Sequence, residues 1–472
     1  MSKITTVAST VPVVTEGGSA DNAKWRFTGG FLAFSVLSGA AFYMTMSVLV
    51  PQRLRDIGIA NSTAVLGTIN AVGSIASIFI ALFIGALSDR TATRWGRRTP
   101  WIFCGAFIYG ICFWALSRPI SAVIIGLVYV LALIGLNMVQ APIYARISDQ
   151  VAPTSRATVS AAIGAGGVIG QGIGTLVGSS LIEHMELGFI CAGMCALAAG
   201  VLSVVIAPRE PSSENMPKNT DEPLWKVVAA SLTPSLKNCA DFYRAFICRT
   251  CLIVAYQMVF SYQLYILQDY IGQDKLSAAA SIQVISVITM IVSIIASLVA
   301  GPIADALNRR KAPIIVACTF FAIGLAMPWI LPTQQGMFLF GGIASFGYGM
   351  YLSVDQALNV DVLPNKETAG KDLGFMNIAT CAGQAIGVAI TSTLVSVLGS
   401  YTVVFPVAIG MTAIAAIIAG IAAIFLNPAL NNEPERTAYR RAGKNLPTLR
   451  YLHMFGSTQR ARPQTYETRQ QW

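Results

Sequence analysis

Twelve long apolar stretches constrain this chain more than any other feature of its sequence. A helix needs about 20 predominantly apolar residues to cross the hydrocarbon core of a bilayer. Charged residues are only 11% of the 472 residues, less than half of the roughly 25% typical of a soluble domain. This composition excludes a disordered chain and a nucleic-acid-binding protein and argues against a soluble enzyme. We predict an all-α membrane protein whose twelve transmembrane helices cover residues 27–50, 61–87, 99–117, 119–144, 157–182, 187–207, 243–268, 277–304, 312–331, 335–360, 371–398 and 401–426.

The distribution of Lys and Arg predicts the orientation of these spans. With the N-terminus inside, the inner segments carry 27 of the 32 basic residues and the outer loops carry four, which are Arg53, Arg55, Arg118 and Lys275. Because cytoplasmic loops are enriched in Lys and Arg, we predict that both termini are cytoplasmic. The first 23 residues are polar and resemble no cleavable signal peptide, so the first span is expected to act as an uncleaved anchor in the cell (plasma) membrane.

The chain reads as two related halves. Gly85-Ala-Leu-Ser-Asp89 matches Gly301-Pro-Ile-Ala-Asp305 at an offset of 216 residues, and Gln171-Gly-Ile-Gly174 matches Gln384-Ala-Ile-Gly387 at an offset of 213. Duplicated halves of this kind are common in transporters. The predicted organisation is a cytoplasmic N-terminal segment (1–26), an N-terminal six-helix bundle (27–207), a cytoplasmic linker (208–242), a C-terminal six-helix bundle (243–427) and a basic cytoplasmic tail (428–472) that either contacts lipid headgroups or is solvated.

Motifs in both halves resemble those of a known family. The segment from Gly85 to Arg98, GALSDRTATRWGRR, resembles the signature loop between helices 2 and 3 of the major facilitator superfamily. Its longer form, followed by Pro100-Trp101, and the region from Val354 to Gly374 are similar to the sucrose-transporter and glycoside-cation-symporter branch. The resemblance implies the major facilitator fold, with two pseudo-symmetric bundles that transport a solute without a cofactor.

The signature loop is expected to act in gating. Its glycines permit close helix approach, and Asp89 can accept hydrogen bonds from backbone amides and guanidinium groups. An alternative is that the basic residues only fix topology and contact anionic lipid. The residues assigned to this motif and its second copy are Gly85, Asp89, Arg90, Gly96, Arg97, Arg98, Asp305, Arg309 and Arg310.

Two charged residues lie clearly within the spans. At the helical rise of 1.5 Å per residue, Asp355 is about 9 Å and Arg249 about 12 Å from the inner end of its span. The resemblance implies that both spans line the central cavity. Asp355 and Arg249 are therefore expected either to neutralise each other as a buried pair or inner gate, or to separate during transport so that Asp355 takes up a proton.

Uncharged polar and aromatic side chains in four spans suit a neutral, hydroxyl-rich solute. The alternative is hydrogen bonding and aromatic packing between helices. Sucrose-type symporters often carry an acidic residue in the fourth span, where this chain has Gln140. The candidate cavity residues are Tyr43, Asn137, Gln140, Tyr144, Tyr256, Gln257 and Tyr351, and Gln171 is instead expected to form a hydrogen bond between the halves.

We predict a secondary active transporter for a small, neutral, sugar-like solute, coupled to a proton or sodium gradient. It is expected to act as a monomer among membrane lipids, with no metal, cofactor or nucleic-acid partner. ATP-driven pumping is not expected because Gly370-Lys371 is followed by Asp372, which departs from the phosphate-binding motif. The alternatives are a proton-coupled exporter of drugs or metabolites and a non-transporting membrane sensor or lipid-handling protein.

Overall fold

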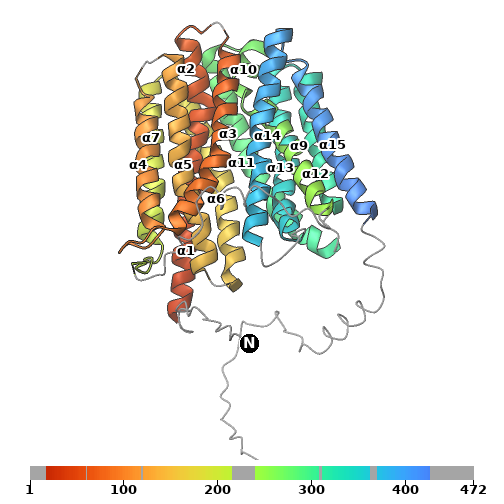
Figure 1. Ribbon diagram of the computed structural model, residues 1–472. Helices are drawn as coiled ribbons and strands as arrows, with labels where there is room; N and C mark the ends of the chain where they lie inside the picture. Colours follow the sequence, from red (N-terminus) through yellow and green to blue (C-terminus); the bar gives the residue numbers. More distant parts are fainter. Residues whose placement is uncertain are drawn as a thin grey trace, which may run out of the picture. The chain divides into compact units, whose positions relative to one another are not determined.

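The computed structural model describes residues 18–59, 61–118, 121–151, 153–214, 240–307, 311–361 and 369–425. In these ranges every regular element is a helix, and most of the helices run side by side (Figure 1). Each of the twelve predicted stretches corresponds to a helix or to a run of helical segments. The elements are α1 (Gly18–Met44), η1 (Thr45–Leu49), α2 (Val50–Asp56), α3 (Ser62–Asp89), α4 (Thr99–Ala115), α5 (Ala122–Gln150), α6 (Pro153–Ser180), α7 (Met185–Ile206), α9 (Ala240–Phe260), α10 (Gln263–Tyr265), η2 (Ile266–Tyr270), α11 (Lys275–Leu307), α12 (Lys311–Ile330), α13 (Gln334–Asp361), α14 (Ala369–Leu398) and α15 (Val404–Phe425).

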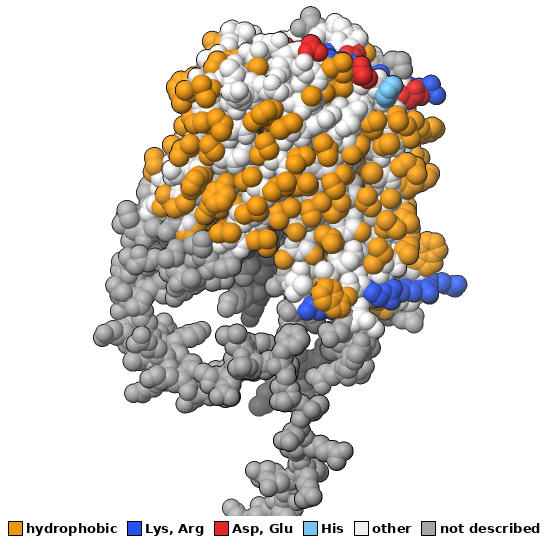
Figure 2. All heavy atoms as spheres, turned by 180° about the vertical axis from the view of Figure 1, so that it is seen from behind, with side chains coloured by type: hydrophobic (Ala, Val, Ile, Leu, Met, Phe, Trp, Pro, Cys, Tyr) orange, Lys and Arg blue, Asp and Glu red, His pale blue; other side chains and the backbone are white. Residues whose placement is uncertain are grey.

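The length and hydropathy of these helices fit a multi-pass membrane protein. Nine helical spans in the described residues are long and apolar enough to cross a bilayer. A tenth is the pair Phe242–Phe260 and Gln263–Tyr270, which is bent by 44°; α4 and α15 are apolar but shorter. On the face shown in Figure 2, hydrophobic side chains form a broad band between two ends that carry charged side chains, as expected for a surface that contacts lipid.

Several helices extend beyond the predicted apolar stretches because their polar ends have partners. The helix α1 begins at Gly18, and its Arg26 Nε donates a hydrogen bond of 2.9 Å to the Ile206 carbonyl at the end of α7. The helix α5 continues to Gln150, well past the predicted end at residue 144, and includes Arg146. Hydropathy alone therefore places the membrane core but not the helix ends.

Glycines set the packing of equivalent helix pairs in the two halves. A Cβ built on Gly174 of α6 would lie 2.4 Å from the Ala40 carbonyl oxygen of α1. In the second half, a Cβ built on Gly387 of α14 would lie 2.6 Å from the Val254 carbonyl oxygen of α9. The sequence offsets within these two contacts are 213 and 214 residues, so the repeat in the sequence is also a repeat in packing.

The first and seventh spans are irregular at equivalent positions. The first passes through the π-helical segment η1, and the seventh ends its α-helix at Phe260 and resumes at Gln263. At the offset of 214, Ser47 in η1 corresponds to Ser261 in the break. Both serines are buried, and both hydroxyls lack a hydrogen-bond partner within the described part of the chain.

Contacts between the two halves involve two helix pairs above all. The helix α3 of the first half packs against α14 of the second, and α6 packs against α11. The structure leaves residues 1–17, most of the predicted linker and the tail from residue 426 outside the described ranges.

Candidate functional site

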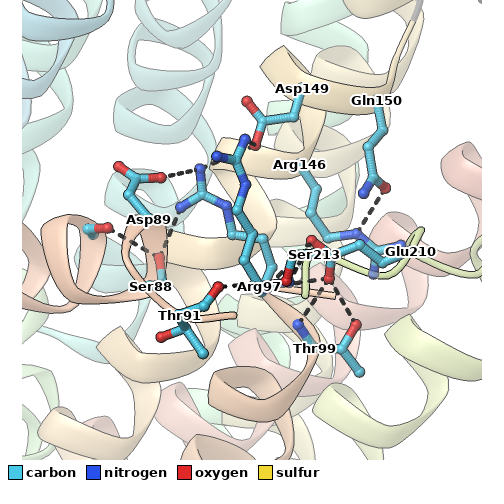
Figure 3. A network of polar contacts seen from close by, with 12 residues as sticks. Ser88, Asp89, Thr91, Arg97, Thr99, Arg146, Asp149, Gln150, Glu210 and Ser213 are labelled. Carbon is cyan, nitrogen blue, oxygen red and sulfur yellow. Dashed lines mark hydrogen bonds and ion pairs between the residues drawn. The ribbon is translucent and has the colours of Figure 1, made fainter. Parts of the chain in front are cut away.

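The signature loop is held by a carboxylate that follows α7. Gly96 has a φ of 90°, a left-handed conformation that favours glycine, and the chain then enters α4 at Thr99. The Glu210 side chain accepts hydrogen bonds from the backbone amides of Arg97 (3.2 Å), Arg98 (3.1 Å) and Thr99 (3.0 Å), and from the Thr99 hydroxyl (2.9 Å) (Figure 3). Glu210 thereby satisfies amide groups that the first turn of a helix leaves unpaired.

Gly96 is required here for a second reason. A Cβ built on Gly96 would lie 2.3 Å from the Glu210 Cδ atom. A side chain at residue 96 would therefore displace the carboxylate as well as strain the backbone. The other signature glycine behaves differently: a Cβ on Gly85 would meet no described atom within 4 Å, so the close helix approach expected at Gly85 is not present.

Arginine side chains join three helices at this end of the first half. Arg98 is buried and donates to Asp149 at 3.0 Å and to Ser88 at 2.7 Å. It also forms an ion pair with Asp89 at 2.5 Å. Arg97 donates to the same Asp149 at 3.0 Å. The signature loop therefore ties α3 and α4 to the end of α5.

Arg146 extends this network to the start of the predicted linker. Its side chain is only 1% exposed and donates to the Pro208 carbonyl at 2.8 Å and to Gln150 at 3.0 Å. Sequence analysis counted Arg146 among the residues that fix topology and assigned no role to Glu210. The acidic residue between two prolines directly after a span, Pro208-Arg209-Glu210-Pro211, was the available signal.

The signature cluster consists of Ser88, Asp89, Arg97, Arg98, Thr99, Arg146, Asp149 and Glu210, all from the first half. Their contacts in Figure 3 run between α3, α4, α5 and the segment after α7. In the second copy, the Asp305 side chain, Arg309 and Arg310 lie outside the described residues. Whether the cluster also gates transport stays a prediction.

A second polar group is buried within the second half. The Arg249 guanidinium of α9 donates to Asp355 of α13 and, at 2.9 Å, to the Thr380 hydroxyl of α14. The Tyr351 hydroxyl donates to the other oxygen of Asp355 at 2.7 Å. Only 4% of the Asp355 side chain and 15% of the Arg249 side chain is exposed. The structure thus brings together the two charges that helix depth had paired, and it uses the Tyr351 hydroxyl to hold Asp355.

Stacked aromatic rings connect this pair to the boundary between the halves. The Tyr256 ring stacks on Tyr348 with centroids 4.1 Å apart and on Phe260 at 5.0 Å. Tyr43 of α1 meets Phe260 edge-on at 5.6 Å. The Gln171 amide of α6 donates to the Tyr256 hydroxyl, so the expected hydrogen bond between the halves is confirmed. We call Tyr43, Gln171, Tyr256, Phe260 and Tyr348 the aromatic group.

The remaining candidate cavity residues have partners on their own or neighbouring helices. The Asn137 amide donates to the Leu133 carbonyl at 2.7 Å and to Ser77 of α3 at 3.1 Å. Gln140 donates to the Tyr144 hydroxyl one turn along α5 at 3.0 Å. Gln257 is buried on α9. For Asn137, these contacts match the alternative of hydrogen bonding between helices.

The described residues were also searched for metal ligands. Within the part of the chain that the structure describes, no group of three or more His, Cys, Asp or Glu side chains is arranged to hold a metal ion. The polar chemistry in this region comes from ion pairs, hydroxyls, amides and aromatic rings.

Two repeated helical bundles that meet along polar and aromatic side chains are the architecture of a secondary transporter. A family model for the Major Facilitator Superfamily matches residues 31–272 and 245–458. The chain belongs to this superfamily. No curated protein matches the sequence.

Solved structures share the fold at low sequence identity. The nucleoside transporter NupG, solved in a mutant form, has a TM-score of 0.66 and 14% identity, covering 84% of this chain and 99% of that one. The human organic anion transporter MFSD10 (TETRAN) has a TM-score of 0.63 and 16% identity, with coverage of 84% and 99%. A bacterial homologue of the human lysosomal transporter Spinster, inward-facing and occupied, has a TM-score of 0.58 and 13% identity, with coverage of 86% and 96%. The likeness is one of fold, and no branch of the superfamily follows from it.

Proposed function

We propose that this protein transports a small, neutral, sugar-like organic solute by alternating access, in symport with a proton or another cation. The aromatic group supports a ring-shaped neutral solute, because it combines stacked ring faces with hydroxyl and amide groups from both halves. Aromatic faces together with a few placed polar groups are typical of small-molecule sites. We propose that Tyr43, Tyr256 and Tyr348 contact the solute, and that the protein works as a monomer in the cell membrane.

The observation that carries the coupling is the Arg249–Asp355 pair and its connection to the aromatic group. The Tyr351 hydroxyl is bonded to Asp355, and the Tyr351 ring lies 6.4 Å from the Tyr348 ring, which stacks on Tyr256. A rearrangement of the stacked rings around a solute is therefore one contact away from the carboxylate. Separation of the ion pair leaves a buried charge unpaired, and proton uptake by Asp355 neutralises it.

Replacing Asp355 by Asn tests this proposal. Asn keeps the size of the side chain but cannot exchange a proton, so we expect accumulation of solute against its gradient to be lost while solute exchange across the membrane is retained. The measurement is uptake of labelled sucrose and of a panel of labelled monosaccharides into proteoliposomes, with and without an imposed proton gradient. The panel first identifies a solute that the unmodified protein transports.

Asp274→Asn is the matched control, because Asp274 is an acidic residue in the connection before α11, where it accepts the Leu276 amide. It should leave accumulation unchanged. Full gradient-driven accumulation by Asp355→Asn would rule out a proton on Asp355 and favour a static pair. Uptake of none of the sugars by the unmodified protein would contradict the sugar-like solute.

A further inference from the structure

Charged and polar side chains join the two halves at the end opposite the signature loop. Figure 1 shows α2 and α10 at this end. Arg55 of α2 forms an ion pair with Asp269 of η2 and also donates to Gln268. The Lys275 ammonium at the start of α11 pairs with Asp56 at 3.2 Å, and the Gln268 amide donates to Gln52 at 3.1 Å. We call these residues the clamp: Gln52, Arg55, Asp56, Gln268, Asp269 and Lys275.

The clamp lies on the pseudo-two-fold axis that relates the halves. The glycine contacts described above align the first span with the seventh at an offset of 214 residues. This offset makes Arg55 equivalent to Asp269, and Pro51 equivalent to Tyr265. Equivalent positions of two related bodies meet only near the axis that relates them. Arg55 pairs with Asp269, and the Tyr265 hydroxyl donates to the Pro51 carbonyl at 2.8 Å.

Two features make the clamp more than an exposed surface ion pair. The Arg55 guanidinium lies 4.2 Å from the centre of the Tyr265 ring, and about a quarter of its side chain is exposed. Partial desolvation over an aromatic face strengthens the interaction of a cation. Asp56 also accepts a 2.7 Å hydrogen bond from Gln52 on its own helix, which orients the carboxylate toward Lys275.

The helices that carry the clamp are irregular just below it. The π-helical segment η1 ends at Leu49, one residue before α2 begins, and the break at Ser261 comes shortly before α10. Irregular helical turns of this kind often mark functional hinges. At both irregularities a buried serine hydroxyl lacks a partner among the described residues. The clamp therefore sits on two short segments that each have a possible bending point beneath them.

We propose that the clamp is a latch that keeps the two halves closed at this end, and that Arg55–Asp269 and Lys275–Asp56 separate whenever the transporter opens here. This inference concerns the closure of the molecule and does not depend on which solute it carries. The signature cluster cannot supply the same restraint through the contacts described above, because all of those contacts lie within the first half.

Charge reversal tests the latch through the accessibility of a thiol beneath it. Ser47 is 2% exposed in the closed arrangement, so a Ser47→Cys background places a protected thiol below the clamp. The protein is held in lipid nanodiscs and exposed to a membrane-impermeant maleimide, and labelling at position 47 is quantified by peptide mass spectrometry. Arg55→Asp or Asp269→Arg alone should raise the labelling rate about fivefold, because each sets like charges against each other.

The double variant Arg55→Asp with Asp269→Arg restores opposite charges and should return labelling close to the rate of the Ser47→Cys parent. Arg94→Asp is the control for charge reversal itself, because the Arg94–Glu214 pair is exposed and belongs to the signature-loop end; its labelling should not change. Lys275→Asp with Asp56→Lys provides an independent swap should either Arg55 variant fail to fold. Equal labelling in the single variants and the parent, or labelling in the double variants as fast as in the singles, would overturn the proposal.

Discussion

Glu210 is the residue whose role was least visible in the sequence. Its carboxylate accepts three backbone amides and a hydroxyl at the start of α4. We expect Glu210→Gln to lower the free energy of unfolding by about 1.5–3 kcal/mol, because hydrogen bonds to a charged group are lost and the new amide NH₂ faces other donors. The apparent melting temperature of the purified protein in detergent measures this effect.

Glu214→Gln is the matched control. Glu214 pairs with Arg94 on the surface, where the two side chains are 48% and 84% exposed. Its replacement should change stability by less than about 0.5 kcal/mol. Equal effects of the two substitutions would show that Glu210 is not a cap of α4.

At the scale of helices, packing of α6 against α1 gives a sharp prediction. A Cβ on Gly174 would press against a backbone carbonyl of α1, which cannot rotate away as a side chain can. Gly174→Ala should destabilise the protein by about 1–3 kcal/mol through overpacking. Thermal unfolding of the purified variant provides the measurement.

Gly164 lies on the same helix and supplies the control, since a Cβ there would meet no described atom within 4 Å. Gly164→Ala should be neutral or slightly stabilising, because alanine has the higher helix propensity. A Gly174→Ala variant as stable as Gly164→Ala would mean that α1 and α6 can move apart without loss.

The helices were predictable because a bilayer demands length and apolarity, and these properties are local in the sequence. The ends of α5 were not, because Arg146 and Asp149 are polar residues whose partners come from distant segments. The irregular turns at Ser47 and Ser261 carry no proline or glycine nearby in the segments Thr45–Leu49 and 261–262, so nothing in those residues indicated them. In the site, helix depth paired Asp355 with Arg249, whereas Glu210 binds backbone amides, which leave no trace in side-chain patterns.

At the scale of the whole molecule, the distribution of basic residues predicts which side of the membrane each end faces. Alkaline phosphatase is active only after export, and green fluorescent protein fluoresces when it folds in the cytoplasm. We expect a C-terminal green fluorescent protein fusion to fluoresce and a C-terminal phosphatase fusion to be inactive. A phosphatase inserted after Gly58, in the connection between α2 and α3, should be active. The opposite pattern would invert the topology and place the clamp in the cytoplasm.

The Arg55–Asp269 contact also bears on how two such halves can be combined. In a dimer built from two copies of the first half, the position on the axis would present arginine to arginine, and two copies of the second half would present aspartate to aspartate. Either arrangement sets like charges against each other, so the divergence of a single duplicated position favours the mixed pair over both symmetric ones. A designer who wished to recreate a symmetric ancestor from this chain would have to neutralise that position before anything else.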